Sequence, residues 1–410
     1  MEPGHALICG AGIAGPATAY WLNRHGWDTT VIERADRFRS GGQNIDIRGT
    51  AREVMRRMGL EDAALQHGTG EKGTQFVDER GHVRAQFDAS GPGDGPTAEM
   101  EILRGELSRL LIDRLDGQSE LVTGDHVTAI ADGQDKAVVS FANSADRAFD
   151  LIVVAEGAQS STRDLIFGRG VPLRPVGLYM TWLAIPPEPH DTDWWRWYNA
   201  PGRRVATLRP GKTGSAAPAD TKATLSFASN LPGLDRLDAA AQRQLLTEVF
   251  AGAGWEVPRI LAALDHTSWF FERATQVRMR HWTTGRAALA GDTAWAPTPV
   301  TGMGTSLALI GAYVLAHHLN RSDTRAEAFA AYEDAMRDFV RKSQRLPPGG
   351  PRLLHPRTRN GIRVVHGVGR VLAAPPSRRL LALGSKVAPD TGFQLPAVER
   401  EPHSATDTHY

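Results

Sequence analysis

Apolar and polar positions follow a strand–helix–strand order at the start of the chain. Residues 5–9 form a mostly apolar run that ends at a glycine, which predicts a buried parallel strand. Residues 14–25 carry helix-forming side chains, and Gly26 is placed to end the helix. Residues 29–32 are β-branched and apolar, so they predict a second buried strand.

The pattern changes character twice further along the chain. Up to about residue 171 it predicts a strand at 44–47 after Gly41 and Gly42, a helix at 50–58, a hairpin at 74–88, a loop at 90–96, a helix at 105–115 and a buried strand at 151–155. Residues 172–275 contain short runs of period two, which predict a mostly antiparallel sheet. After residue 287 we expect a buried strand, helices at 302–319, 325–345, 360–373 and 376–386, and a disordered polar tail.

The composition narrows the class of protein. A length of 410 residues suits two closely associated domains, and 41% hydrophobic with 23% charged residues is typical of a globular protein. A formal net charge of +1 gives no bulk attraction to nucleic acid or to an anionic membrane. Cys9 is the only cysteine, which fits a reducing compartment. The longest nearly apolar stretch, 307–316, is shorter than the ~20 residues of a membrane span, and residues 1–5 lack the basic region of a signal peptide, so we expect a cytoplasmic protein.

A glycine-rich motif lies between the first predicted strand and helix. Gly10, Gly12 and Gly15 fit the pattern G-x-G-x-x-G in the required context. We expect the first glycine to allow a tight turn, the second to let the backbone approach a diphosphate, and the third to let helix and strand pack closely. Glu33, at the end of the second strand, can accept hydrogen bonds from ribose hydroxyls. The motif predicts a dinucleotide site without separating FAD from NAD.

A second motif, far along the chain, bears on that choice. Residues 289–306 combine a strand, an acidic turn at Asp292, a loop rich in proline and glycine, and the start of a helix. An aspartate at the end of a parallel strand can accept a hydrogen bond from a second ribose or from a ribityl chain. The helix start after it directs N–H groups at an electron-rich group.

At this motif the sequence resembles the FAD-dependent aromatic hydroxylases of the para-hydroxybenzoate hydroxylase type, which include the tetracycline-inactivating monooxygenases. The resemblance covers roughly residues 5–345. In that family a Gly-Asp motif binds the ribityl side of the flavin, and the loop and helix after it face the isoalloxazine ring. The matching positions are Gly291, Asp292, Pro299, Gly302 and Gly304.

Two further family motifs can be placed on the chain. Arg104 opens a segment that resembles the family's Arg-x-x-Leu helix start, whose arginine contacts FAD, and a guanidinium suits a phosphate. Residues 155–163 resemble the family's Asp-Gly motif, but Glu156 stands where the family has an aspartate. The residues expected to contact the cofactor are Gly10, Gly12, Ile13, Ala14, Gly15, Glu33, Arg34, Arg48, Arg104, Gly291, Asp292, Gly302, Met303 and Gly304.

The resemblance implies a monooxygenase in which the flavin carries the chemistry. NADPH or NADH would reduce FAD, dioxygen would add to it, and a flavin C4a-hydroperoxide would hydroxylate an aromatic or polyketide-like small molecule. No acid–base residue is therefore assigned, and the loop of Pro299, Gly302 and Gly304 is expected to face the flavin. The 14 histidines show no metal-ligand spacing, so no metal is expected.

Substrate selectivity is expected to lie in the middle sheet and in the flavin-side loops. The candidate substrate residues are Tyr179, Trp182, Phe227 and Trp295, although aromatic side chains of a sheet more often pack in the core. The tetracycline-inactivating relatives have a histidine at the position of Trp295. We therefore expect a larger and less polar cavity wall here, suited to a planar apolar substrate.

Together the motifs predict an α/β protein with a Rossmann-like FAD-binding domain, an inserted antiparallel substrate sheet and C-terminal helices. The expected division is 1–73, 100–171 and 276–345 for FAD, 74–99 and 172–275 for the substrate, 346–395 for the helical segment and 396–410 for the tail. A flavin reductase driven by NAD(P)H, a Baeyer–Villiger oxygenase and a flavin-binding protein without turnover stay open as alternatives, because each can use the same motifs. A flavin-dependent halogenase does not, because residues 182–186 lack the tryptophan spacing of that family.

Overall fold

Strand β1 (His5–Cys9) lies inside a six-stranded sheet of the order β17-β18-β11-β1-β2-β7. The computed structural model describes residues 2–38, 42–89, 98, 100–133, 135–171, 173–211, 220–346, 348–374 and 393–397. The other strands of this sheet are β2 (Asp28–Glu33), β7 (Ser119–Thr123), β11 (Leu151–Val154), β17 (Thr283–Thr284) and β18 (Ala287–Leu289). Neighbouring strands are parallel except β17 with β18. The continuous apolar runs of β1, β2 and β11 follow from this position, because a central parallel strand is covered on both faces.

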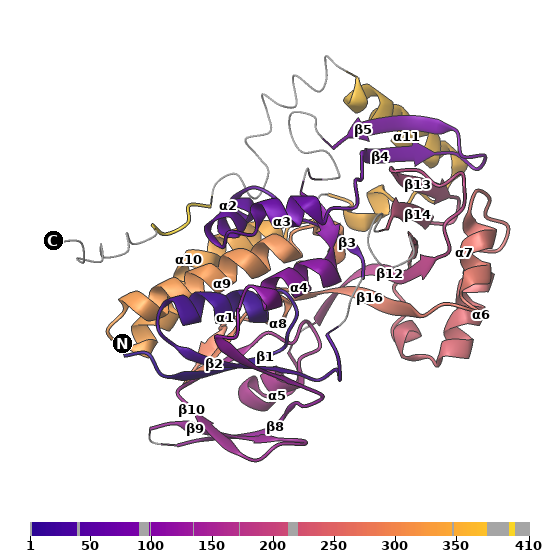
Figure 1. Ribbon diagram of the computed structural model, residues 1–410. Coiled ribbons are helices and arrows are strands. Elements are labelled where there is room, and N and C mark those ends of the chain that lie inside the picture. The colour runs from indigo at the N-terminus through magenta and orange to yellow at the C-terminus, as the bar shows by residue number, and fades with distance from the viewer. Residues whose placement is uncertain are drawn as a thin grey trace, which may run out of the picture.

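Helices lie on one side of this sheet (Figure 1). They are α1 (Ala14–Arg24), α2 (Thr50–Arg57), α3 (Glu61–Gln66), α4 (Arg104–Asp113), α9 (Gly304–Arg321) and α10 (Arg325–Ser343). All residues of α9 from Thr305 to Ala316 are buried, and α9 packs against α1, α2 and α10. The other side carries α5 (Ser161–Phe167), β8 (Val127–Asp132), β9 (Ala137–Phe141) and β10 (Arg147–Phe149). Within the described ranges, no helix combines the length and apolarity that a membrane span requires.

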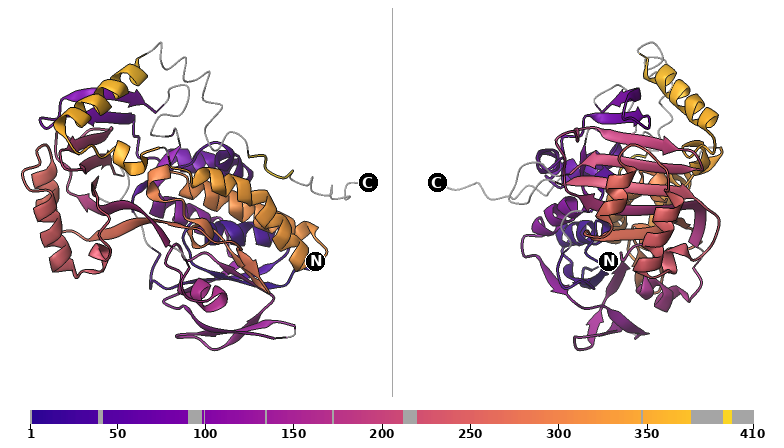
Figure 2. Two further views of the ribbon diagram at one scale, coloured as in Figure 1. Left: turned by 180° about the vertical axis from the view of Figure 1, so that it is seen from behind. Right: turned by 90° about the vertical axis from the view of Figure 1, so that its right-hand side faces the viewer.

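A second sheet of seven strands lies beside the first, in the order β16-β12-β15-β14-β13-β4-β5. Its neighbours are antiparallel except β13 with β4. The strands are β4 (Gly73–Val77), β5 (Val83–Asp88), β12 (Leu173–Ile185), β13 (Trp195–Ala200), β14 (Arg204–Pro210), β15 (Thr221–Ala228) and β16 (Trp269–Val277). Helices α6 (Ala239–Val249) and α7 (Val257–Ala263) cover its outer face, and α11 (Arg359–Ala373) packs on β5 (Figure 2).

Shorter elements complete the described chain. They are β3 (Asn44–Asp46) paired with β6 (Glu101–Leu103), α8 (Asp292–Trp295), and the 3-10 turns η1 (Leu234–Arg236), η2 (Pro299–Thr301) and η3 (Gly350–Leu353).

Strands β12 and β16 form a long antiparallel pair at one edge of the second sheet, and this pair extends toward the first sheet (Figure 1). Their register joins Leu173 to Val277 at one end and Leu183 to Trp269 at the other. One irregularity interrupts this register, between Pro175 and Tyr179. The two sheets are therefore linked by a hydrogen-bonded ribbon in addition to their packing contacts.

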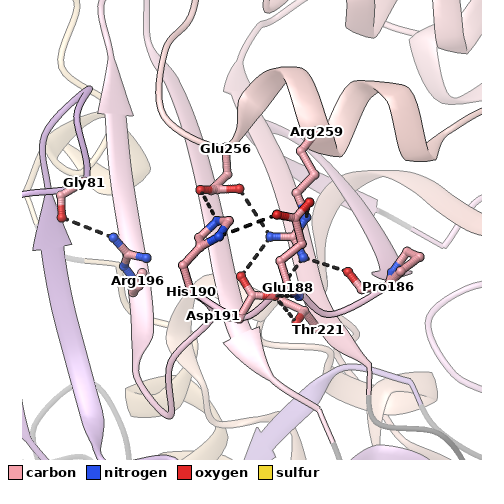
Figure 3. Close-up of polar contacts among 9 residues, drawn as sticks. All are labelled: Gly81, Pro186, Glu188, His190, Asp191, Arg196, Thr221, Glu256 and Arg259. Carbon is pink, nitrogen blue, oxygen red and sulfur yellow. Dashed lines mark hydrogen bonds and ion pairs between the residues drawn. The ribbon is translucent and has the colours of Figure 1, made fainter.

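An ion-pair network fixes α7 to the connection between β12 and β13 (Figure 3). Arg259 donates to both carboxylate oxygens of Asp191, at 2.8 and 2.7 Å, and also pairs with Glu256 and Glu188. Burial alone would raise the pKa of Asp191, but hydrogen bonds from Arg259 and Thr221 outweigh it and bring this pKa to about 2. The network explains how a short helix is held on the outer face of the sheet.

The predicted fold class is confirmed, and the predicted strands and helices that fall on described residues are present. Helices α3, α5 and α8 were not predicted from the sequence pattern, and neither were α6 and α7, which lie within the segment predicted as sheet. Four predicted features lie outside the described residues: Gly41, the loop at 90–96, the helix at 376–386 and the tail beyond residue 397.

Candidate active site

The glycine-rich turn joins β1 to α1, and its three glycines have different surroundings. Gly10 has a φ of +105°, and a Cβ there would lie 2.6 Å from the carbonyl oxygen of Ala155. A Cβ on Gly15 would lie 1.9 Å from the carbonyl oxygen of Gly10. A Cβ on Gly12 would meet only the Nη2 atom of Arg104, at 3.7 Å. Gly10 and Gly15 therefore serve close backbone packing, whereas Gly12 leaves open space beside a guanidinium, as a diphosphate requires.

Helix α4 holds two backbone carbonyl groups of this turn by hydrogen bonds. Ser108 on α4 donates to the carbonyl oxygens of Ala11 and Gly12, at 2.8 and 3.1 Å. No side chain caps the first turn of α1, and no acidic side chain lies in it. The first N–H groups of α1 are thus left for an anion.

Glu33 lies at the end of β2, beside the turn. Its Oε2 accepts a hydrogen bond from the N–H of Ala11 and its Oε1 from that of Ala35, both at 3.0 Å. The carboxylate is thereby held at the carboxyl edge of the sheet, with lone pairs left for ribose hydroxyls. The neighbouring Arg34 is exposed and donates to Ser161 Oγ at 2.7 Å, so it bridges β2 to α5.

Asp292 is brought next to the turn by the packing of Gly291. Gly291 has a φ of +61°, and a Cβ there would lie 2.8 Å from the Cβ of Ala14. The Asp292 side chain is exposed, yet protein surrounds it so closely that burial raises the pKa of its carboxyl, while Arg104 lowers it. Asp292 Oδ1 also lies 3.6 Å from a Cβ placed on Gly304, so this exposed carboxylate stands in a concave space between the Gly-Asp turn and the start of α9.

The loop that precedes α9 presents open backbone to the same space. Thr298 has a φ of +83°, which a residue other than glycine adopts at a cost of about 1–3 kcal/mol. Pro299 is exposed, and nothing lies within 4 Å of a Cβ placed on Gly302, which has a φ of +64°. Met303 is buried, and α9 then starts at Gly304 with no capping or acidic side chain in its first turn. This loop has the open, positively polarised backbone expected for a flavin-facing segment.

Two arginines approach this space from β3 and β6. Arg104 follows β6 directly, and its guanidinium lies over Gly12 and lowers the pKa of Asp292. The backbone N–H of Arg48 donates to Ser306 Oγ at 3.4 Å, in the first turn of α9, and its side chain pairs with Asp46 at 3.4 Å. Of these two arginines, Arg104 is the one whose guanidinium lies beside the glycine-rich turn.

Glu156 has a local structural role. Its carboxylate accepts hydrogen bonds from the Ser160 hydroxyl at 2.6 Å and from the Thr162 N–H and hydroxyl at 3.1 and 2.7 Å. The buried Arg163 donates to the carbonyl oxygens of Ala158 and Thr293, which fastens this motif to the turn that carries Asp292. The longer side chain at position 156 thus serves the start of α5.

The predicted substrate residues Tyr179 and Phe227 lie in the core instead. Tyr179 is fully buried, and its ring stacks against Phe227 and Phe271, with centroids 5.6 and 5.5 Å apart. All three pack with residues of α6 and α7 on the outer face of the second sheet. Phe227 also borders a shallow depression on this face, which is not the concave space at Asp292. Because side chains alternate along a strand, Trp182 on β12 points to the inner face and stays a candidate.

Trp295 also requires a correction. It is 1% exposed, and its indole packs against Trp282 and Tyr332, with ring centroids 4.7 and 5.8 Å apart. A Cβ on Gly311 of α9 would lie 2.8 Å from its ring, so the helix leaves room for it. Trp295 therefore fills the core beneath the Gly-Asp turn and does not form the expected cavity wall.

Two charged groups on the inner face were missed. Glu272 on β16 accepts a hydrogen bond from Trp182 Nε1 at 3.0 Å. Arg209 on β14 donates to both oxygens of Glu71, at 2.7 and 3.1 Å, and burial raises the pKa of the adjacent Glu101 to about 7 although Arg209 lowers it. The alternation of side chains along β14 and β16 separates the two faces of each strand, and this could have pointed to both groups. It does not show which of the two faces is covered by helices.

Known proteins are similar to this chain over most of its length. Residues 5–345 match the family model described as an FAD binding domain. A flavin-dependent monooxygenase from an unknown prokaryotic organism is 33% identical over 344 residues, which cover 82% of this chain and 87% of that protein. The flavin-dependent monooxygenase eupH of a Phoma species is 32% identical over an alignment of 430 residues, covering 96% of this chain and 95% of that protein.

A solved structure extends the comparison to three dimensions. The crystal structure of the tetracycline destructase Tet(55) matches with a TM-score of 0.79 and 27% identity, over 96% of this chain and 98% of that one. The fold described above is thus shared with that protein over nearly the whole of both chains. The chain belongs to the FAD-dependent aromatic hydroxylases, a family of flavin-dependent monooxygenases.

Proposed function

We propose that the protein uses bound FAD and a nicotinamide cofactor, NADPH or NADH, to insert one oxygen atom of O₂ into an aromatic or polyketide-like small molecule. The observation that carries the proposal is the concave space at Asp292. Three distant segments meet here, because Gly12 lies beside the Arg104 guanidinium and Gly304 lies beside Asp292, and this arrangement supports the binding of a flavin dinucleotide. A cytoplasmic location is part of the proposal, because the single Cys9 is free and buried.

The residues present fit FAD part by part. The uncapped start of α1, the open side of Gly12 and the Arg104 guanidinium suit the diphosphate. Glu33 would accept hydrogen bonds from the adenosine ribose, and Asp292 from the ribityl chain. The open backbone at Gly302 would lie against the isoalloxazine ring.

The chain's own contribution to catalysis is then position and electrostatics. Bound FAD would supply the electron transfer from NAD(P)H and the activation of dioxygen. The N-terminus of α9 would stabilise negative charge that develops on a flavin beside it, because no side chain caps the first turn of this helix. The inner face of the second sheet would hold the substrate opposite the flavin loop, and its strands exclude water from one side of that space.

Removing the two sugar-binding carboxylates tests the cofactor assignment. Purified protein should carry FAD, and Asp292→Ala and Glu33→Ala should each weaken FAD by about ten- to hundredfold, because a charge-assisted hydrogen bond contributes about 1.5–3 kcal/mol. Asp146→Ala is the matched control, since that carboxylate lies exposed on a loop between β9 and β10. FAD affinity is measured by flavin fluorescence, and unchanged affinity in both site variants would contradict the assignment.

The reaction itself is tested by measuring reduction of the flavin by NADPH or NADH and the transfer of oxygen to a substrate. NADPH or NADH should bleach the flavin without oxygen, and in air a substrate should gain one oxygen atom, detected by mass spectrometry with ¹⁸O₂. Bleaching without oxygen transfer to any phenolic or polyketide compound would favour a flavin reductase, and no bleaching would favour a flavin-binding protein without turnover.

A further inference from the structure

Glu272 stands on the inner face of the second sheet. It lies on β16 opposite Met180 of β12, while its neighbour Phe271 points outward into the aromatic core. Side chains alternate along a strand, so Glu272 and Trp182 share the face opposite to α6 and α7. Both side chains are half-buried, which leaves part of each open to the inner space.

The carboxylate of Glu272 accepts one side-chain hydrogen bond and forms no ion pair within the described residues. Its Oε1 accepts a hydrogen bond from Trp182 Nε1 at 3.0 Å, and no Lys, Arg or His of the described chain forms an ion pair with it. Burial raises the pKa of Glu272, the indole hydrogen bond lowers it, and the negative charge of Asp292 raises it again. Gln276, four residues further along the same face of β16, donates a hydrogen bond to the carbonyl oxygen of Pro297 at 3.0 Å, so this face of the strand is directed toward the loop that follows Asp292.

A half-buried carboxylate without a cation destabilises the folded chain unless donors are supplied. A carboxylate offers about four acceptor positions, and the indole occupies one of them. The other oxygen is therefore free to accept a hydrogen bond from a molecule that enters the inner space. The rigid indole ring fixes the direction in which the carboxylate presents that oxygen.

We propose that Glu272 is a specificity-determining residue that accepts a hydrogen bond from a hydroxyl or N–H group on the edge of the substrate, with Trp182 as its positioning residue. This inference rests on the proposed function and adds a substrate class: neutral or cationic aromatic or polyketide-like molecules with a donor on that edge. A substrate with a carboxylate at the same edge is disfavoured, because Glu272 and Asp292 would both repel it in a space of low polarity.

Three flat aromatic probes of nearly equal size test whether the site prefers a neutral hydrogen-bond donor over a molecule without a donor or with a carboxylate. We would titrate the FAD-loaded protein with 2-naphthol, 2-methoxynaphthalene and 2-naphthoate, and follow the flavin absorbance. The wild type should bind 2-naphthol about tenfold or more tightly than either other probe, because only 2-naphthol donates a hydrogen bond without adding negative charge. Equal affinity for the three probes, or binding of none of them, would overturn the inference.

Variants then assign the preference to Glu272. Glu272→Gln should bind 2-naphthol about tenfold more weakly and 2-naphthoate more tightly, whereas Glu272→Asp should keep the order of the probes. Trp182→Phe should reduce the difference in affinity between 2-naphthol and the other two probes without abolishing it, because it removes only the N–H group that orients the Glu272 carboxylate. Glu248→Gln, on the exposed side of α6, is the control and should match the wild type. An unchanged probe order in Glu272→Gln would exclude Glu272 as the determinant.

A failure of this inference can be told apart from a failure of the proposed function. FAD content and NAD(P)H-driven bleaching are measured on the same samples. If both are normal and the probe preference is missing, the substrate class is wrong and the monooxygenase proposal stands. If FAD content or bleaching is lost already in the wild type, the proposed function itself fails.

Discussion

Replacing Gly12 and Gly15 one at a time by alanine should separate cofactor binding from folding within a single turn. In Gly15→Ala the new methyl group would lie 1.9 Å from the carbonyl oxygen of Gly10 and 3.4 Å from Ile8 Cγ2. Backbone atoms cannot move aside by rotating a side chain, so α1 must shift away from β1. Overpacking of this kind costs about 1–3 kcal/mol, and more where the backbone itself has to move. We therefore expect Gly15→Ala to unfold at clearly lower denaturant concentration, with or without FAD.

Gly12→Ala should behave differently although it lies in the same motif. Its methyl group would meet only Arg104 Nη2, at 3.7 Å, which is an ordinary contact, so the stability of the apoprotein should change by at most about 0.5–1 kcal/mol. The methyl group takes the space beside the guanidinium where the diphosphate is expected. The loss of one charge-assisted hydrogen bond, about 1.5–3 kcal/mol, should weaken FAD by about ten- to hundredfold.

The assay combines urea unfolding of the apoprotein with fluorescence titration by FAD. Gly367→Ala on α11 is the control, because nothing lies within 4 Å of its new Cβ. If Gly12→Ala binds FAD as tightly as the wild type does, Gly12 does not serve the cofactor. If Gly15→Ala unfolds at the urea concentration of the wild-type midpoint, Gly15 is not needed for the packing of α1 on β1.

Two further predictions concern buried groups. Trp295→Ala should lower the free energy of unfolding by about 3–5 kcal/mol, as for other truncations of buried aromatic side chains, and urea unfolding measures this change. Unchanged stability together with altered substrate choice would instead support Trp295 as part of the cavity wall. Burial lowers the pKa of His355 from 6.5 to about 4, so the folded state binds a proton less readily than the unfolded state. Stability should therefore be fully present above pH ~6.5 and fall by about 1.4 kcal/mol per pH unit down to pH ~4, roughly 3 kcal/mol in all. Unfolding at several pH values should show a flatter slope in His355→Gln, and an identical slope would exclude His355 as its source.

The parts of the site that follow from local sequence were predictable. Glu33 ends a buried strand, and Gly12 and Asp292 each follow one by three residues. An apolar run followed by glycine or an acidic residue marks these places without knowledge of the rest of the fold. Their convergence was expected because parallel strands share a carboxyl edge. The different duties of Gly10, Gly12 and Gly15 also follow from the motif.

The aromatic residues were harder because alternation has two phases. Period two shows that Tyr179 and Trp182 face opposite sides of β12, but not which side the helices cover. Helices α6 and α7 determine which face of the sheet is covered. Neither was predicted from the sequence, because the whole of their segment was assigned to sheet. Trp295 follows Asp292 by three residues within α8, and this single helical turn carries it into the core beneath the site. A loop in place of α8 would have left the direction of that side chain open.

The paired crossing of β12 and β16 limits how the two halves of the molecule can move. A hinge between the sheets would have to bend both strands together, because their ladder of hydrogen bonds couples one to the other. The ladder is interrupted only between Pro175 and Tyr179, where Gly177 has a φ of +81°. Any opening between the halves that involves this crossing should therefore pivot at Gly177. Elsewhere the continuous ladder of hydrogen bonds should make the two strands move together as one unit.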